Sequence, residues 1–134
     1  MDRVRDAMVS EPRALPASAF AREAGELLTR PEVRAVFVVD GGQLTGVVTR
    51  NTLVSKVVAE GRDPNAVVLG EIGEEPYYTI GPEVSLEDAF RFLEEHDAER
   101  VPVVESGRLV GVLSRSVLRR RLAEDEEPGD PSDE

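Results

Sequence analysis

The sequence has no cysteine and only one histidine among its 134 residues. Disulfides and thiolate metal sites are therefore excluded, and a zinc or iron site built from histidines is not expected. No apolar run approaches the ~18 residues of a membrane span, and the start, MDRVRDAMVSEP, lacks the apolar core of a signal peptide. We therefore expect a cytoplasmic protein with no membrane partner.

Basic residues are outnumbered, and the net charge is −11. Residues 124–134, EDEEPGDPSDE, hold seven of the 27 acids and no base, which leaves 20 acids and 16 bases elsewhere. This tail has no apolar residue to bury, so we expect it to be disordered, with an acidic docking segment as the alternative. The triplet Arg119 to Arg121 is one short basic patch on an acidic chain, so nucleic-acid binding is only a minor alternative.

Two windows of the sequence repeat each other. AVFVVDGGQLTGVVTRNTL, residues 35–53, aligns without a gap to RVPVVESGRLVGVLSRSVL, residues 100–118, and nine of nineteen positions are identical. Chance would give about one or two matches even in valine-rich segments. The chain is therefore predicted to be a tandem repeat with an offset of 65 residues.

Hydrophobic periodicity predicts the order strand, helix, strand, strand, helix in each half. In the first half these elements fall near residues 12–16, 20–30, 35–40, 44–49 and 53–58, with Gly41 and Gly42 as a hairpin turn. In the second they fall near 76–80, 86–93, 101–104, 109–113 and 116–123. PYYTI, residues 76–80, is rich in strand-forming residues, so this leading strand is predicted more clearly than its counterpart. Leu53, Val54, Val57 and Val58 are predicted to form one apolar stripe.

We therefore predict an α/β (α+β) fold made of repeat 1 at residues 1–61, a linker at 62–68, repeat 2 at 69–123 and the acidic tail at 124–134. One half alone would expose the face of its sheet. Two halves can bury these faces against each other, which removes apolar surface from water at roughly 25 cal/mol per Å². We expect the halves to pack sheet to sheet with pseudo-twofold symmetry and two equivalent clefts.

These residues resemble the CBS domain family, whose members occur as tandem pairs called Bateman modules. Residues 76–118 are similar to the family pattern nearly throughout, including the Arg-Val-Pro-Val-Val strand and a Gly-x-x-Ser turn before the last helix. The first repeat follows the pattern more loosely, with Phe37 where the second has Pro102.

The resemblance implies binding of an adenosine-containing ligand, such as AMP, ADP, ATP or S-adenosylmethionine, in the clefts between repeats, with no cofactor required. A Ser or Thr at a helix N-cap with an acid three residues on would place a hydroxyl, a carboxylate and free backbone N–H groups together. The expected ligand-binding residues are Val36, Phe37, Thr49, Arg50, Thr52, Tyr78, Arg100, Val101, Pro102, Ser114 and Arg115.

The sequence departs from the family where the resemblance implies a ribose-binding aspartate. That residue is Thr52 in the first repeat and Val117 in the second. Threonine can offer one hydroxyl whereas valine can only pack, so we expect at most one nucleotide per chain, at the Thr49 to Thr52 turn. Arg50 and Arg115 are candidates to face a phosphate, and the alternative is that they are solvated or paired to a surface acid. Tyr78 is a candidate to stack on a base, and His96 is expected to be an exposed cation at a helix end.

No enzyme motif or metal-ligand set accompanies these residues, so we do not expect an enzyme. The first hypothesis is a stand-alone regulatory module that senses the ligand and signals to an unknown partner protein. The alternative, favoured by the loss of both acids, is a ligand-independent assembly module. Homodimerisation is expected in either case, because the resembled family commonly pairs its modules through their helices.

Overall fold

The computed structural model describes residues 2–10 and 12–126. Its helices are α1 (Val4–Ala7), α2 (Ala21–Leu28), α3 (Arg50–Leu53), the π-helical turn η1 (Val54–Val58), α4 (Leu69–Ile72), α5 (Leu86–Glu95) and α6 (Arg115–Glu126). Its strands are β1 (Val9–Ser10), β2 (Ala14–Pro16), β3 (Val36–Asp40), β4 (Gln43–Val48), β5 (Arg100–Glu105) and β6 (Arg108–Ser114). The pairs α1 and α4, α2 and α5, and β4 and β6 each begin 65 residues apart, so the tandem repeat is confirmed well beyond the matched windows.

The described residues form two compact units. The first-repeat unit contains residues 12–77 and 106–109, and the second-repeat unit contains residues 2–10, 78–105 and 110–126. Each unit therefore includes the leading segment of the other sequence repeat. The repeat boundaries at 61 and 69 stay a prediction about the sequence, and the compact units follow a different division.

The exchange of leading segments is fixed by backbone hydrogen bonds and by burial. The Leu69 N–H at the start of α4 donates to the Ala19 carbonyl at 2.8 Å, and the Val4 N–H at the start of α1 donates to the Val84 carbonyl at 2.9 Å. These two bonds are related by the 65-residue offset. α4 buries Leu69 and Ile72 in the first-repeat core, and α1 buries Val4 and Ala7 in the second.

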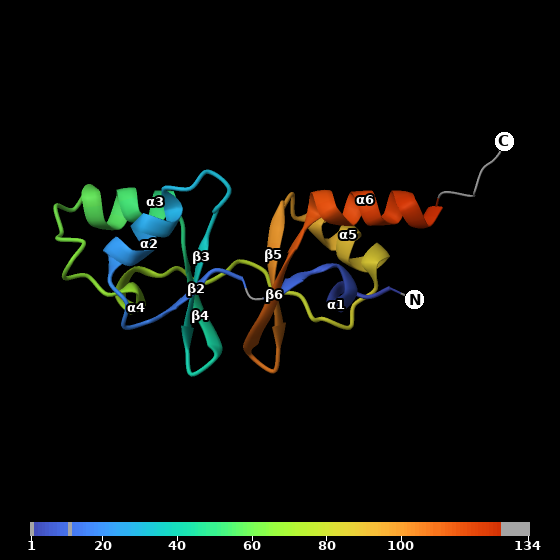
Figure 1. The fold of residues 1–134 in the computed structure, drawn as a ribbon, viewed down its shortest axis with the longest axis horizontal. Helices are drawn as coiled ribbons and strands as arrows, with labels where there is room; N and C mark the ends of the chain where they lie inside the picture. Colours follow the sequence, from blue (N-terminus) through green and yellow to red (C-terminus); the bar gives the residue numbers. More distant parts are fainter. Residues whose placement is uncertain (1, 11, 127–134) are drawn as a thin grey trace. The chain divides into compact units, whose positions relative to one another are not determined.

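In the first-repeat unit, β2 pairs parallel to β3, and β3 pairs antiparallel to β4. Helices α2 and α3 lie on one side of this sheet (Figure 1). The core between them is built from alanine, valine, leucine and isoleucine side chains, including Ala24, Leu28, Val36 and Val48. Gly41 and Gly42 turn the β3–β4 hairpin with φ of 59° and 86°, which confirms the predicted turn.

In the second-repeat unit, β5 pairs with β6, and β1 pairs antiparallel to β6 with Val9 opposite Val112. Helices α5 and α6 lie together on one side of these strands (Figure 1). Leu86 and Leu93 of α5 and Leu118 of α6 are fully buried on that side. The sheet therefore presents its apolar face to the helices, as the alternation of residues in β5 and β6 predicts.

Gly46 and Gly111 occupy the same position of β4 and β6, where the exchanged segment crosses the strand. A Cβ on Gly111 would lie 2.6 Å from Met8 Sδ and 2.9 Å from the Val9 carbonyl oxygen. A Cβ on Gly46 would lie 3.3 Å from the Cα of Gly73. A side chain at Gly111 would therefore clash with the neighbouring segment, and one at Gly46 would require that segment to move by a few tenths of an ångström.

Two predictions of local structure were wrong. Residues 76–80 form a single parallel bridge, Ile80 to Val103, and no extended strand, whereas the counterpart β2 pairs at three positions. Pro76 lacks a backbone donor, which limits the ladder at that end. The predicted apolar stripe is also divided: Val57 is buried, while Val54 and Val58 are 56% and 70% exposed, because the i to i+5 bonds of the π turn rotate them away from the core.

Helix α6 continues to Glu126, three residues into the range predicted as an acidic tail. The rest of that prediction, for residues 127–134, lies outside the described residues.

The exchange of leading segments predicts which unit loses stability when the Leu69 side chain is shortened. Leu69→Ala should lower the free energy of unfolding by about 2–5 kcal/mol, and Glu71→Ala, exposed on the same short helix, by no more than about 1 kcal/mol. Amide hydrogen exchange should locate the loss of protection in β3 and β4, with β5 and β6 less affected. Loss of protection chiefly in β5 and β6 would contradict the exchange.

Candidate functional site

The turn between β4 and α3 is closed by two threonines that cap each other. Thr49 is the N-cap residue, and its hydroxyl accepts from the Thr52 N–H at 3.3 Å. The Thr52 hydroxyl in return accepts from the Thr49 N–H at 3.0 Å. This is the reciprocal arrangement of a capping box, with threonine in the place where glutamate or glutamine is usual.

All hydrogen-bonding capacity of the Thr52 hydroxyl is used inside the chain. Thr52 is 0% exposed, and its hydroxyl donates to Oε1 of Glu74 at 3.1 Å. It accepts from the Thr49 N–H and, across 3.1 Å, from the Thr49 hydroxyl. A hydroxyl has one donor and two acceptor sites, so none remains. The Thr52 hydroxyl therefore orders the turn and holds Glu74, and a direct contact of Thr52 with a ligand stays a prediction.

Glu74 was not identified from the sequence. Its backbone joins the edge of β4, because the Val47 N–H donates to the Glu74 carbonyl at 2.7 Å and the Glu74 N–H donates to the Val47 carbonyl at 2.9 Å. Its side chain is 49% exposed, and Oε2 lies 4.0 Å from Nζ of Lys56. The repeat offset offered a signal, since the counterparts of Thr52 and Glu74 are Val117 and Val9. The first repeat therefore has a polar pair at the two positions where the second repeat has an apolar pair.

Arg50 is exposed beside this turn. Its guanidinium donates to the Arg30 carbonyl at 2.7 Å, just beyond the C-terminal end of α2. The guanidinium of Arg50 is therefore bonded to a backbone carbonyl, and the surface acid that was one expected partner does not take this place. A cation near the C-terminal end of a helix is favourable, and a guanidinium has five N–H donors, of which this hydrogen bond uses one.

The corresponding turn of the second-repeat unit has different chemistry. The Ser114 hydroxyl accepts from the Val117 N–H at 3.2 Å, so the N-cap is kept, but Val117 adds no polar group. Arg115 lies 3.6 Å from the carboxylate of Asp97 and 3.7 Å from that of Glu99. Here the acid alternative is the one observed, as two ion pairs, although the buried Nε of Arg115 has no hydrogen-bond partner within the described residues.

The other predicted ligand-binding residues divide by burial. Val36 and Val101 are 0% exposed and belong to the two cores, and Phe37 and Pro102 are buried as well. These four side chains pack inside the two units, and the binding of a ligand by these residues stays a prediction. Arg100, at the start of β5, is exposed.

Tyr78 is 38% exposed and stacks on His96, with ring centroids 4.1 Å apart and planes 28° apart. Phe92 meets the Tyr78 ring edge-on at 5.8 Å. His96 lies at the C-cap of α5 and is exposed, as expected. One face of the Tyr78 ring is therefore already covered by His96.

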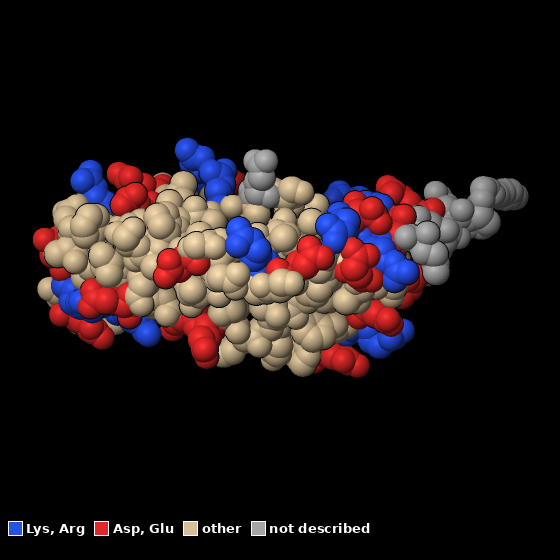
Figure 2. Space-filling view, turned by 90° about the horizontal axis from the view of Figure 1, so that it is seen from below, with Lys and Arg blue, Asp and Glu red and all other residues tan. Residues whose placement is uncertain are grey.

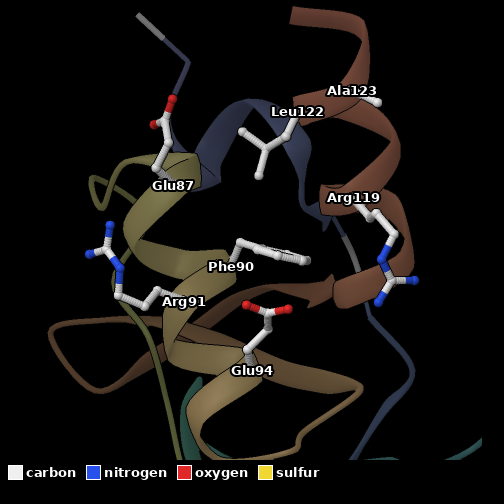
Figure 3. Close-up of a pocket in the computed structure, with 7 residues that line it drawn as sticks. All are labelled: Glu87, Phe90, Arg91, Glu94, Arg119, Leu122 and Ala123. Atoms are coloured by element: carbon white, nitrogen blue, oxygen red, sulfur yellow. The ribbon is translucent and has the colours of Figure 1, made fainter. Parts of the chain in front are cut away.

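A shallow groove of about 420 Å³ runs between α5 and α6 (Figure 3). Phe90, Leu122 and Ala123 supply its apolar wall, and the guanidinium of Arg119 lies 5.9 Å from the centre of the Phe90 ring. Glu87, Arg91 and Glu94 of α5 also line it. We refer to this feature as the α5–α6 groove.

Basic and acidic side chains are interspersed on the face drawn in Figure 2. Arg121 pairs with Asp2 at 2.8 Å and donates to the Asp6 carbonyl, so the basic triplet is partly used inside its own unit. Among residues 2–10 and 12–126, no group of three or more His, Asp or Glu side chains is arranged to hold a metal ion. None of the helices in these ranges is long and apolar enough to cross a membrane.

Comparison with known proteins agrees with the internal repeat. The model of the CBS domain family matches residues 4–59 and 69–124. CBS domain-containing protein YhcV of Bacillus subtilis is 29% identical over 129 residues, which cover 96% of this chain and 91% of that protein. Hypoxic response protein 1 of Mycobacterium tuberculosis is 34% identical over 85 residues, or 63% of this chain, and the match spans only 59% of that protein's length.

The structure of CBSX2 in complex with AMP superposes with a TM-score of 0.76 and 26% identity, covering 95% of this chain and 100% of that one. The repeated turns, the exchanged leading segments and the family match lead to one conclusion: this chain belongs to the CBS domain family and contains two tandem CBS domains.

Proposed function

We propose that this chain is a regulatory module that binds an adenosine-containing ligand at the turn between β4 and α3 and passes the change to a partner protein. AMP, ADP, ATP and S-adenosylmethionine are the candidate ligands. The role is binding, without catalysis. The supporting observation is the likeness over nearly the whole chain to CBSX2, a protein whose structure contains AMP.

The chemistry of the turn suits a phosphorylated ligand. Thr49 orders the backbone of the turn, and the guanidinium of Arg50 is exposed beside it. A guanidinium binds phosphate through charge-assisted hydrogen bonds, which are about twice as strong as neutral ones. Lys56 brings a second cation within 4.0 Å of the Glu74 carboxylate.

Regulation requires the ligand to bind one state of the protein more tightly than another. The effect that it passes to a partner cannot exceed this difference, which is typically 1–3 kcal/mol in allosteric proteins. A ligand at one hundred times its dissociation constant also stabilises the folded chain by about 2.7 kcal/mol, so melting temperature gives a second measure of binding.

The different partners of the two arginines predict one nucleotide per chain. Arg50→Ala should raise the dissociation constant for AMP about tenfold or more, because it removes a charge-assisted hydrogen bond worth about 1.5–3 kcal/mol. The matched substitution Arg115→Ala should leave the affinity unchanged, since Asp97 and Glu99 already balance that guanidinium. Isothermal titration calorimetry measures both affinity and stoichiometry. Two equal sites, or a larger effect at Arg115, would contradict this prediction.

A second candidate function is assembly, and exposed apolar helical surfaces favour it. In the first-repeat unit, Val54 and Val58 are exposed on η1. In the second-repeat unit, the α5–α6 groove exposes part of Phe90 and Leu122. We infer that the chain forms a homodimer through such surfaces, because symmetric pairs are the commonest oligomers.

Val58→Glu should weaken this dimer, because it places a charge on an apolar surface that association would remove from water. Sedimentation velocity over a concentration series should show a higher dissociation constant for the variant. Ser18→Glu adds the same charge at an exposed position in the loop before α2 and should leave the dimer unchanged. A wild-type chain that stays monomeric at every concentration would exclude the assembly function.

A further inference from the structure

A carboxylate reaches the turn between β4 and α3 from a distant segment of the chain. We propose that Glu74 is the residue that recognises the sugar of the bound ligand, by accepting hydrogen bonds from the vicinal hydroxyls of a ribose. This inference rests on the proposed function and assigns its specificity to a residue 22 positions beyond Thr52.

The Thr52 hydroxyl directs the carboxylate. Its single proton is donated to Oε1 of Glu74, while its two lone pairs accept from Thr49. Because Thr52 is 0% exposed, its own hydroxyl is not offered to a ligand, whereas the carboxylate that it holds belongs to a side chain that is 49% exposed. Thr52 is thus a positioning residue, and Glu74 is the residue that meets the ligand.

Glu74 also has free hydrogen-bond acceptor sites and a fixed backbone, and recognition of a ligand needs both. An ionised carboxylate has about four acceptor sites, and Thr52 takes one of them. The backbone of Glu74 is held on both sides by Val47, so little conformational freedom is lost when a ligand binds. The contact with Lys56, at 4.0 Å and with both side chains more than 40% exposed, is too weak to occupy the carboxylate.

The second repeat supplies an internal comparison. Val9 pairs with Val112 there as Glu74 pairs with Val47 here, and Val117 replaces Thr52. The acceptor and the hydroxyl that directs it are both absent from that turn. Preference for ribose over deoxyribose therefore belongs to the first-repeat unit alone.

Calorimetric titration with AMP and with 2′-deoxy-AMP tests the assignment. Wild type should prefer AMP. Glu74→Gln should weaken AMP binding about tenfold, because a neutral amide oxygen replaces a charged acceptor, and it should bring the AMP to 2′-deoxy-AMP affinity ratio close to one. Glu75→Gln removes the same charge from the neighbouring exposed residue and should behave as wild type.

Thr52→Val tests the positioning role through the same ratio, which a purely structural role would not change. Its ratio should fall toward one even at temperatures where melting curves show the variant fully folded. Glu74→Asp keeps the charge but shortens the side chain, and it provides a second variant if Glu74→Gln does not fold: AMP binding should weaken and the ratio should fall.

Each result bears on a different claim. If the Glu74 variants bind AMP and discriminate against 2′-deoxy-AMP as wild type does, the assignment of Glu74 is wrong and the proposed function stands. If wild type binds AMP but does not discriminate, sugar recognition by Glu74 is likewise excluded. If wild type binds neither AMP nor 2′-deoxy-AMP, and also fails to bind ADP, ATP and S-adenosylmethionine in the same titration, the proposed function fails, and the assignment fails with it.

Discussion

The two hydrogen bonds between the backbones of Val47 and Glu74 connect the fold of this chain to its chemistry. They attach the leading segment of the second repeat to β4 of the first-repeat unit. Glycine at positions 46 and 73 permits the close approach, and burial of Leu69 and Ile72 anchors α4 nearby. Without this exchange, Glu74 would not reach the β4–α3 turn, and the hydroxyl of Thr52 would have no carboxylate to hold.

Because the chain repeats after 65 residues, equivalent positions of the two units can be compared directly. The two units share their fold but differ in the polar groups at the turn before the last helix. In the first-repeat unit, Thr52 and Glu74 form a polar pair, and in the second the same positions hold Val117 and Val9. A buried hydroxyl without partners costs about 1–3 kcal/mol, so threonine at position 52 is tolerated because both Thr49 and Glu74 satisfy it. Arg50 and Arg115 differ in the same sense, since only Arg115 is balanced by nearby carboxylates. The duplication preserves the fold while the two turns carry different polar groups, and the proposed single nucleotide site rests on this difference.

The sequence was sufficient to predict the features that depend on local pattern. Alternating valines and the Gly41–Gly42 turn predicted the first hairpin, and the match of two windows predicted the repeat. The exchange of α1 and α4 was not predicted, because residues far apart in the chain form those contacts and leave no local periodicity. For the same reason Thr52 was interpreted as a ligand residue, since its partner Glu74 comes from another segment. The burial of Val36 and Val101 in the two cores could not be told from the sequence, because β-branched residues in a strand suit a core and the wall of a binding cleft equally well.

The central claim is that the β4–α3 turn, equipped with Thr49, Thr52 and Glu74, is the nucleotide site and that its counterpart at Ser114 is not. A crystal structure of the chain grown with AMP tests this most directly. The account predicts one nucleotide per chain, with ribose hydroxyls within about 3 Å of the Glu74 carboxylate, the length of a hydrogen bond. AMP bound at Ser114 and Val117, or bound at the first turn with its ribose away from Glu74, would contradict it.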